Sequence, residues 1–224
     1  MSVQNAPFSP VEYARRIAKT RAAMAAAGID ALFVTDPSNQ AWLTGYDGWS
    51  FYVHQGVILT MEGEPHWWGR HMDSLGALRT CWIGRDSIHG YADSYVQSTV
   101  RHPMQDLSRL LRELGLKGAR LGVEMENYYY SAKAHAVLAA ELPDAALVDA
   151  TALVNWQRLV KSDEEIVFIE KAAAISDKVV RTAMEQARPG LRKNELVAGI
   201  FHAALTGVGE DWGDYPAIVP LTPS

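Results

Sequence analysis

Hydrophobic positions along the first 150 residues follow two spacings, one typical of buried strands and one typical of amphipathic helices. Short apolar runs bounded by turn-forming residues predict strands at 31–35, 53–60, 65–69, 87–91, 120–124 and 146–149. Apolar stripes at helical spacing predict helices at 10–27, 37–43, 74–78, 103–114 and 132–142. This succession predicts an α/β domain with a mixed sheet covered by helices.

A different pattern begins at Arg158. Ser162 and Glu165 have the spacing of a capping box, and the acids at 163–165 complement the positive end of a helix dipole. A long helix is therefore expected from residue 163 until Pro189-Gly190 stops it, and a second helix is expected to end at Gly207. We accordingly expect two domains, 1–157 and 158–224.

Composition narrows the class of protein. Among 224 residues, 48% are hydrophobic and 21% are charged, which is ordinary for a globular chain with a buried core. The net charge of −5 with dispersed basic residues argues against nucleic acid as a partner. No apolar run approaches the ~18 residues of a membrane span. The start shows no secretory signal, and Cys81 is the only cysteine, so a reducing, cytoplasmic location is expected.

Aromatic residues are concentrated between positions 42 and 52, where the chain average of 9% would give about one. The interrupting glycines favour a loop that carries large rings. These rings can cap the core, form a wall for a cationic or planar ligand, or make an interface. The cluster consists of Trp42, Tyr46, Trp49, Phe51 and Tyr52.

Several polar residues are candidates for binding. His71, between Arg70 and Asp73, is either a solvated surface group or a ligand contact. Asp211 and Asp214 lie beside aromatic residues and are either solvated or able to face a cationic substrate group. Glu124 follows a strand at the end where α/β folds bind ligands, although a helix or turn cap is the favoured interpretation.

Motifs for common cofactors are absent from the sequence. There is no GxGxxG, GxxxxGK[ST], HExxH, CxxC or GxSxG segment. The seven histidines are scattered, and no two are four residues apart as in a helical zinc site. We therefore expect no metal site and no cofactor in this chain, and its catalytic residues are unknown.

The segment Arg158-Leu159-Val160-Lys161-Ser162-Asp163-Glu164-Glu165-Ile166, with Arg188-Pro189-Gly190 after the helix, resembles the domain junction of the creatinase, prolidase and aminopeptidase P superfamily. Residues 10–155 resemble its N-terminal domain. The resemblance implies that 158–224 begin an α+β catalytic half, the pita-bread fold, left incomplete here, in a protein of roughly 400 residues. The catalytic residues would then follow Ser224. In the peptidases of this superfamily they include the five ligands for two metal ions. This chain alone should therefore be inactive.

Segment 214–221 and the aromatic loop look most like the ectoine hydrolases, relatives of creatinase. That resemblance implies hydrolysis of a C–N bond, opening the cyclic amidine ectoine to N-acetyl-diaminobutyrate in a metal-free site. It also implies a homodimer in which the N-terminal domain reaches the partner subunit's site. The alternatives are an Xaa-Pro dipeptidase or aminopeptidase with two divalent metal ions, and a non-catalytic peptidase-like binding protein. The implied substrate-binding residues are Trp49, Tyr52, His71, Asp211 and Asp214.

Overall fold

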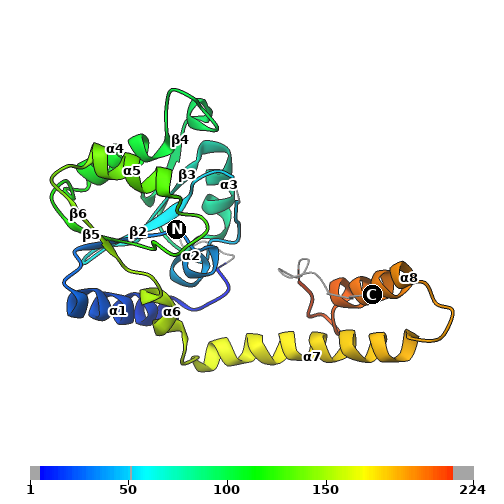
Figure 1. Cartoon of the computed structure of the whole chain (residues 1–224). Coiled ribbons are helices and arrows are strands. Elements are labelled where there is room, and N and C mark those ends of the chain that lie inside the picture. Colours follow the sequence, from blue (N-terminus) through cyan, green and yellow to red (C-terminus); the bar gives the residue numbers. More distant parts are fainter. Residues whose placement is uncertain (1–5, 51, 214–224) are drawn as a thin grey trace. The chain divides into compact units, whose positions relative to one another are not determined.

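The computed structural model describes residues 6–50 and 52–213, and the chain divides into two compact units, Met1–Val160 and Lys161–Ser224 (Figure 1). Each unit has its own set of elements. None of the helices in the described ranges is both long enough and apolar enough to cross a membrane.

The first unit is built around one six-stranded sheet with the strand order β4-β3-β2-β1-β5-β6. Its strands are β1 (Ala31–Val34), β2 (Gly56–Thr60), β3 (His66–Arg70), β4 (Ile88–Tyr91), β5 (Arg120–Val123) and β6 (Ala146–Asp149). Its α-helices are α1 (Pro10–Ala27), α2 (Pro37–Thr44), α3 (His71–Thr80), α4 (Pro103–Glu113), α5 (Ala132–Glu141) and α6 (Leu153–Arg158). The predicted α/β fold with a mixed sheet is confirmed.

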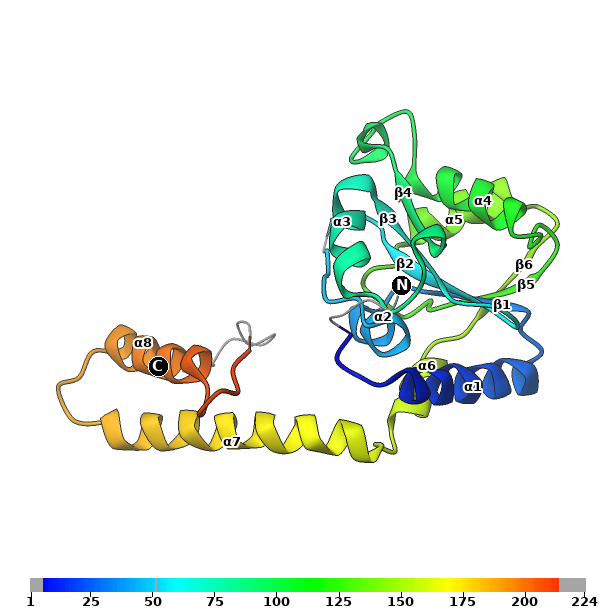
Figure 2. The same cartoon turned by 180° about the vertical axis from the view of Figure 1, so that it is seen from behind.

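Helices cover both faces of this sheet (Figure 2). Alternate residues of β1 point into two separate cores, because successive side chains of a strand face opposite sides. Leu32 and Val34 join a core with residues of α1, α2, α3 and α6, whereas Ala31 and Phe33 join a core with residues of α4 and α5. The sheet is therefore a central layer buried between two helical layers.

The strand directions gather most strand ends at one edge of the sheet. β1 is antiparallel to β2 and parallel to β5, β3 is antiparallel to β2 and parallel to β4, and β6 is parallel to β5. The carboxyl ends of β1, β3, β4, β5 and β6 consequently lie together with the beginning of β2. We call this the carboxyl edge.

Two predicted boundaries were wrong. β2 begins at Gly56 rather than at residue 53, because its partner β1 ends at Val34, opposite Val57, and leaves 53–55 without a ladder on that side. α3 begins at His71 rather than near Ser74, and no side chain caps its start, so the sequence carried no signal for that position.

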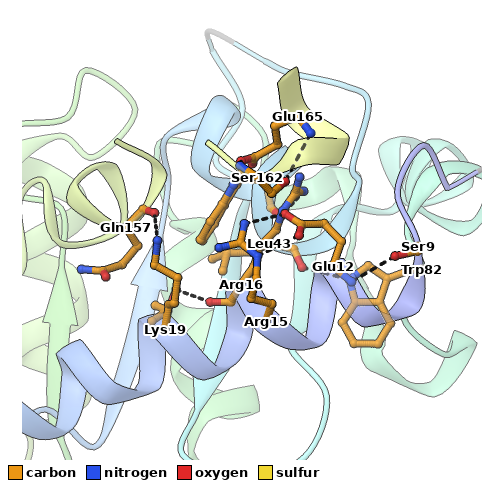
Figure 3. Close-up of polar contacts among 12 residues, drawn as sticks. Ser9, Glu12, Arg15, Arg16, Lys19, Leu43, Trp82, Gln157, Ser162 and Glu165 are labelled. Atoms are coloured by element: carbon orange, nitrogen blue, oxygen red, sulfur yellow. Dashed lines mark hydrogen bonds and ion pairs between the residues drawn. The ribbon is translucent and has the colours of Figure 1, made fainter. Parts of the chain in front are cut away.

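α6 was missed altogether. It has six residues, and its N-cap Ala152 adopts a left-handed conformation (φ 60°) without a side-chain cap. Distant side chains hold it instead: Lys19 Nζ donates to the Gln157 carbonyl at 2.7 Å (Figure 3), and an Arg158 guanidinium nitrogen donates to Asn39 Oδ1 at 2.6 Å. Its stability comes from tertiary contacts, which local patterns do not encode.

The second unit contains the expected helix pair, α7 (Asp163–Gln186) and α8 (Lys193–Thr206). Both bonds of the predicted capping box are present: the Glu165 amide donates to Ser162 Oγ at 3.2 Å, and the Ser162 amide donates to Glu165 Oε2 at 2.8 Å (Figure 3). Lys178 on α7 ties the end of α8, donating to the Gly207 carbonyl at 2.6 Å.

Removal of this cap should loosen the start of α7. We expect Ser162→Ala to cost about 1 kcal/mol locally, the usual effect of losing a serine N-cap. Amide hydrogen exchange in residues 163–166 should then quicken about fivefold. Ser176→Ala is the matched control, because Ser176 lies in mid-helix, where its hydroxyl donates to the Ala172 carbonyl at 3.0 Å and caps no helix end. Equal exchange rates in the two variants would contradict the prediction.

Candidate functional site

Two pockets open at the carboxyl edge, where α/β folds place their ligands. The first, of about 130 Å³, is formed by the segment before β2 and by the segment from the end of β4 to the start of α4. We call it the aromatic pocket. It is lined by Tyr52, Val53, His54, Tyr91, Tyr95, Val96, Gln97, Ser98, Arg101, His102 and Pro103.

Hydrogen bonds fix the walls of the aromatic pocket. The Tyr91 hydroxyl donates to the His54 carbonyl at 2.8 Å and joins β4 to the segment before β2. Arg101 donates to Ser94 Oγ at 3.1 Å, and its guanidinium lies 5.7 Å from the centre of the Tyr95 ring. A fixed guanidinium beside aromatic faces suits a planar carboxylate-bearing ligand.

The two histidines of this pocket are held in their neutral form. Their rings are 5.0 Å apart, and His102 Nδ1 accepts the Met104 amide at 3.2 Å, which caps α4. Burial, with smaller effects from His54 and Lys133, lowers the pKa of His102 to about 4. Burial also lowers the pKa of His54. At neutral pH, both imidazoles therefore offer hydrogen bonds rather than charge.

The second pocket, of about 160 Å³, is acidic and lies at the ends of β1 and β5. Glu124 is its most buried acid, and its carboxylate accepts the Thr35 and Asp36 amides at 2.6 and 2.8 Å and Asn39 Nδ2 at 2.6 Å. These bonds tie β5 to the start of α2. Asp36 is itself the N-cap of α2, so Glu124 supports the entry to that helix instead of capping it. Its lone pairs are largely occupied by the protein itself.

The aromatic cluster divides into two groups. Trp42 and Tyr46 are buried in the core, as the capping interpretation requires. Trp49 and Tyr52 each keep 50% of their surface exposed, and Tyr52 lines the aromatic pocket. Phe51 lies outside the described residues. For the two exposed rings, the interpretations as a ligand wall and as an interface both remain.

The other predicted residues are dispersed. His71 is exposed at the start of α3, while the neighbouring Arg70 binds the Asp93 carboxylate through two nitrogens, at 2.8 and 3.1 Å. Asp211 belongs to the second unit and pairs with Lys171 at 2.7 Å. Asp214 lies outside the described residues. Of the four that the structure describes, Tyr52 alone is among the residues that line the aromatic pocket.

Sequence reasoning missed seven polar or aromatic residues of this pocket. Most of them stand at or next to the ends of strands and helices, and that position was the one available signal. They are His54, Tyr91, Tyr95, Gln97, Ser98, Arg101 and His102. Within the ranges that the structure describes, no three His, Cys, Asp or Glu side chains converge as metal ligands would.

A mixed sheet between two helical layers, with its pockets at the carboxyl edge, makes the first unit a ligand-binding type of α/β domain. Residues 16–160 match the family model of the creatinase/prolidase N-terminal domain, and the chain belongs to that family.

Individual relatives refine this assignment. The ectoine hydrolase of Halomonas elongata is 50% identical, over 97% of this chain and 56% of its own length. An uncharacterised hydrolase/peptidase of Sinorhizobium fredii is 39% identical, over 95% of this chain and 54% of its own. The crystal structure of a prolidase from Thermococcus sibiricus superposes with a TM-score of 0.73 at 20% identity, over 94% of this chain and 53% of that one, a likeness that shows the fold. The chain thus spans about half the length of the curated relatives it matches, which are hydrolases.

Proposed function

We propose that this chain is the N-terminal portion of a C–N bond hydrolase that opens the cyclic amidine ectoine to N-acetyl-diaminobutyrate. The observation that carries the proposal is the 50% identity, over 97% of the chain, to an enzyme named ectoine hydrolase. In this proposal residues 1–157 form the N-terminal domain, and 158–224 begin the catalytic domain. The 224-residue chain by itself is inactive, because the catalytic carboxylate lies further along the protein.

The chemistry of ectoine supports a role for the carboxyl edge. Ectoine carries a delocalised cationic ring, which suits the faces of Trp49 and Tyr52. It also carries a carboxylate, which suits Arg101 and His71. Asp211 and Asp214 carry carboxylates, which suit the cationic ring. In the proposed homodimer, the N-terminal domain supplies its residues to the partner subunit's site.

The proposal is tested by comparing the 224-residue chain with the protein of the complete reading frame. Nuclear magnetic resonance should show conversion of ectoine to N-acetyl-diaminobutyrate by the longer protein, unchanged by a chelator, and none by the chain alone. Chelator-sensitive cleavage of Xaa-Pro dipeptides without ectoine turnover would favour the two-metal peptidase instead. Binding without turnover of either would favour a non-catalytic protein.

Two substitutions test the proposed binding residues in the longer protein. We expect Tyr52→Ala and His71→Ala each to lower kcat/KM for ectoine about 10- to 100-fold, the size of effect expected when a positioning contact is lost. Tyr128→Ala is the matched control, because Tyr128 is fully exposed (101%) and does not line the aromatic pocket. Unchanged ectoine turnover in both test variants would contradict the proposal that these residues act in the partner subunit's site.

A further inference from the structure

Two histidines meet across neighbouring strands on a part of the sheet that the proposed function does not use. His66 begins β3, and His89 lies in β4, which pairs with β3 in parallel. His66 Nδ1 and His89 Nε2 are 3.1 Å apart, while the ring centres are 5.2 Å apart. The rings therefore approach edge to edge through these two nitrogens, rather than by stacking.

This separation is that of a hydrogen bond between the two rings, in which one nitrogen donates and the other accepts, and it also fits two ligands of one metal ion. Imidazole nitrogens bind Zn²⁺ at about 2.0–2.1 Å, so two nitrogens 3.1 Å apart subtend an angle of about 98° at a shared ion. That angle lies between the ideal octahedral and tetrahedral values, about 90° and 109°. We propose that His66 and His89 chelate one divalent late first-row metal ion, of the Zn²⁺, Cu²⁺ or Ni²⁺ class, with water in the remaining positions.

The protonation states favour such a site. Burial lowers the pKa of both rings, and the charge of His66 lowers that of His89 further. Each neutral ring carries one proton, which can reside on the outer nitrogen, so Nδ1 of His66 and Nε2 of His89 can both present lone pairs. Binding then breaks the hydrogen bond between the rings and shifts one tautomer, with no net release of protons.

The surrounding charge also favours a cation. Glu64 acts on His66, and Asp106 and Glu113 act on His89. The one guanidinium that acts on His89, Arg109, is ion-paired with both Asp106 and Glu113, at 2.5 and 3.0 Å. Glu64 is already fixed, since it accepts the Gly84 amide at 2.8 Å. Three carboxylates and one cation leave a negative local field, which attracts a divalent ion without supplying a third ligand.

Calorimetric titration of the untagged protein with ZnCl₂ at pH 7.5 tests the proposal. One equivalent should bind, and His66→Gln and His89→Gln should each weaken binding about tenfold or more, because either change breaks the chelate. His54→Gln is the matched control, since His54 also faces a second histidine ring but makes no such nitrogen contact. Its binding should be unchanged. Equal affinity in the His66 and His89 variants and the unsubstituted protein, or loss of binding in the control, would overturn the proposal.

A second measurement needs no variant. Electron paramagnetic resonance of the Cu²⁺-loaded protein should show coupling to two imidazole nitrogens, and coupling to one or none would count against the chelate. The His89→Gln variant also distinguishes this site from any metal ion that takes part in catalysis. A chelator effect on turnover that survives in His89→Gln comes from another metal site.

Discussion

Replacement of Glu124 by alanine should lower the free energy of unfolding of the first unit by about 3–5 kcal/mol. Glu124 is 5% exposed, and its carboxylate accepts three strong hydrogen bonds, from the Thr35 and Asp36 amides and from Asn39 Nδ2. Truncation leaves these donors without their acceptor in a buried place, and each unsatisfied donor costs about 1–3 kcal/mol. Water entering the space left behind recovers part of this cost.

Urea denaturation followed by tryptophan fluorescence measures this effect, because Trp67 and Trp68 are completely buried in the first unit. Glu126→Ala is the control, since Glu126 is exposed two residues further along and should change the free energy by less than about 0.5 kcal/mol. Glu124→Gln should fall between the two, because it keeps an oxygen for Asn39 and loses an acceptor for the amides. A loss below about 1 kcal/mol for Glu124→Ala would show that the carboxylate does not hold β5 to α2.

Local signals in the sequence were sufficient for most elements. α1 begins after Ser9 and ends before Gly28 as predicted, and Ser162 caps the start of α7. These ends were predictable because capping residues act on amides within three positions of themselves. α6 has no such cap, and the contacts that hold it come from Lys19, 138 residues away from Gln157, and from Asn39, 119 residues away from Arg158. Its existence depends on the assembled sheet and could not be read locally.

The candidate site was less predictable than the fold for the same reason. The aromatic pocket joins the segment around Tyr52 to the one around His102, and Glu124 finds its partners 85–89 residues away. His66 and His89 are 23 residues apart, and this spacing predicts no contact by itself. The two rings meet only because β3 and β4 pair in register. Spacing rules detect sites built within one element, whereas these sites arise from strand order.

Acid should destabilise the first unit through its partly buried histidines. Four histidines in it, namely His54, His66, His89 and His102, have a pKa lowered chiefly by burial. In the unfolded chain each takes up a proton near pH 6.5, whereas in the folded chain each stays neutral to a lower pH, about 4 for His102. Between these values the unfolded state binds more protons, so stability is complete above pH 6.5 and falls as pH decreases.

His102 provides the sharpest test of this dependence. Its ring is only partly buried, so after allowance for solvent screening we expect it to contribute about 1 kcal/mol of the loss by pH 5. His102→Asn preserves an N-cap oxygen for α4 and removes the titrating group. The variant should therefore match the unsubstituted chain at pH 8 and exceed its stability by about 1 kcal/mol at pH 5, measured by urea denaturation at each pH. A stability that stays flat from pH 8 to pH 5, or a variant that keeps the full decline, would mean that the pocket admits the protonated imidazole.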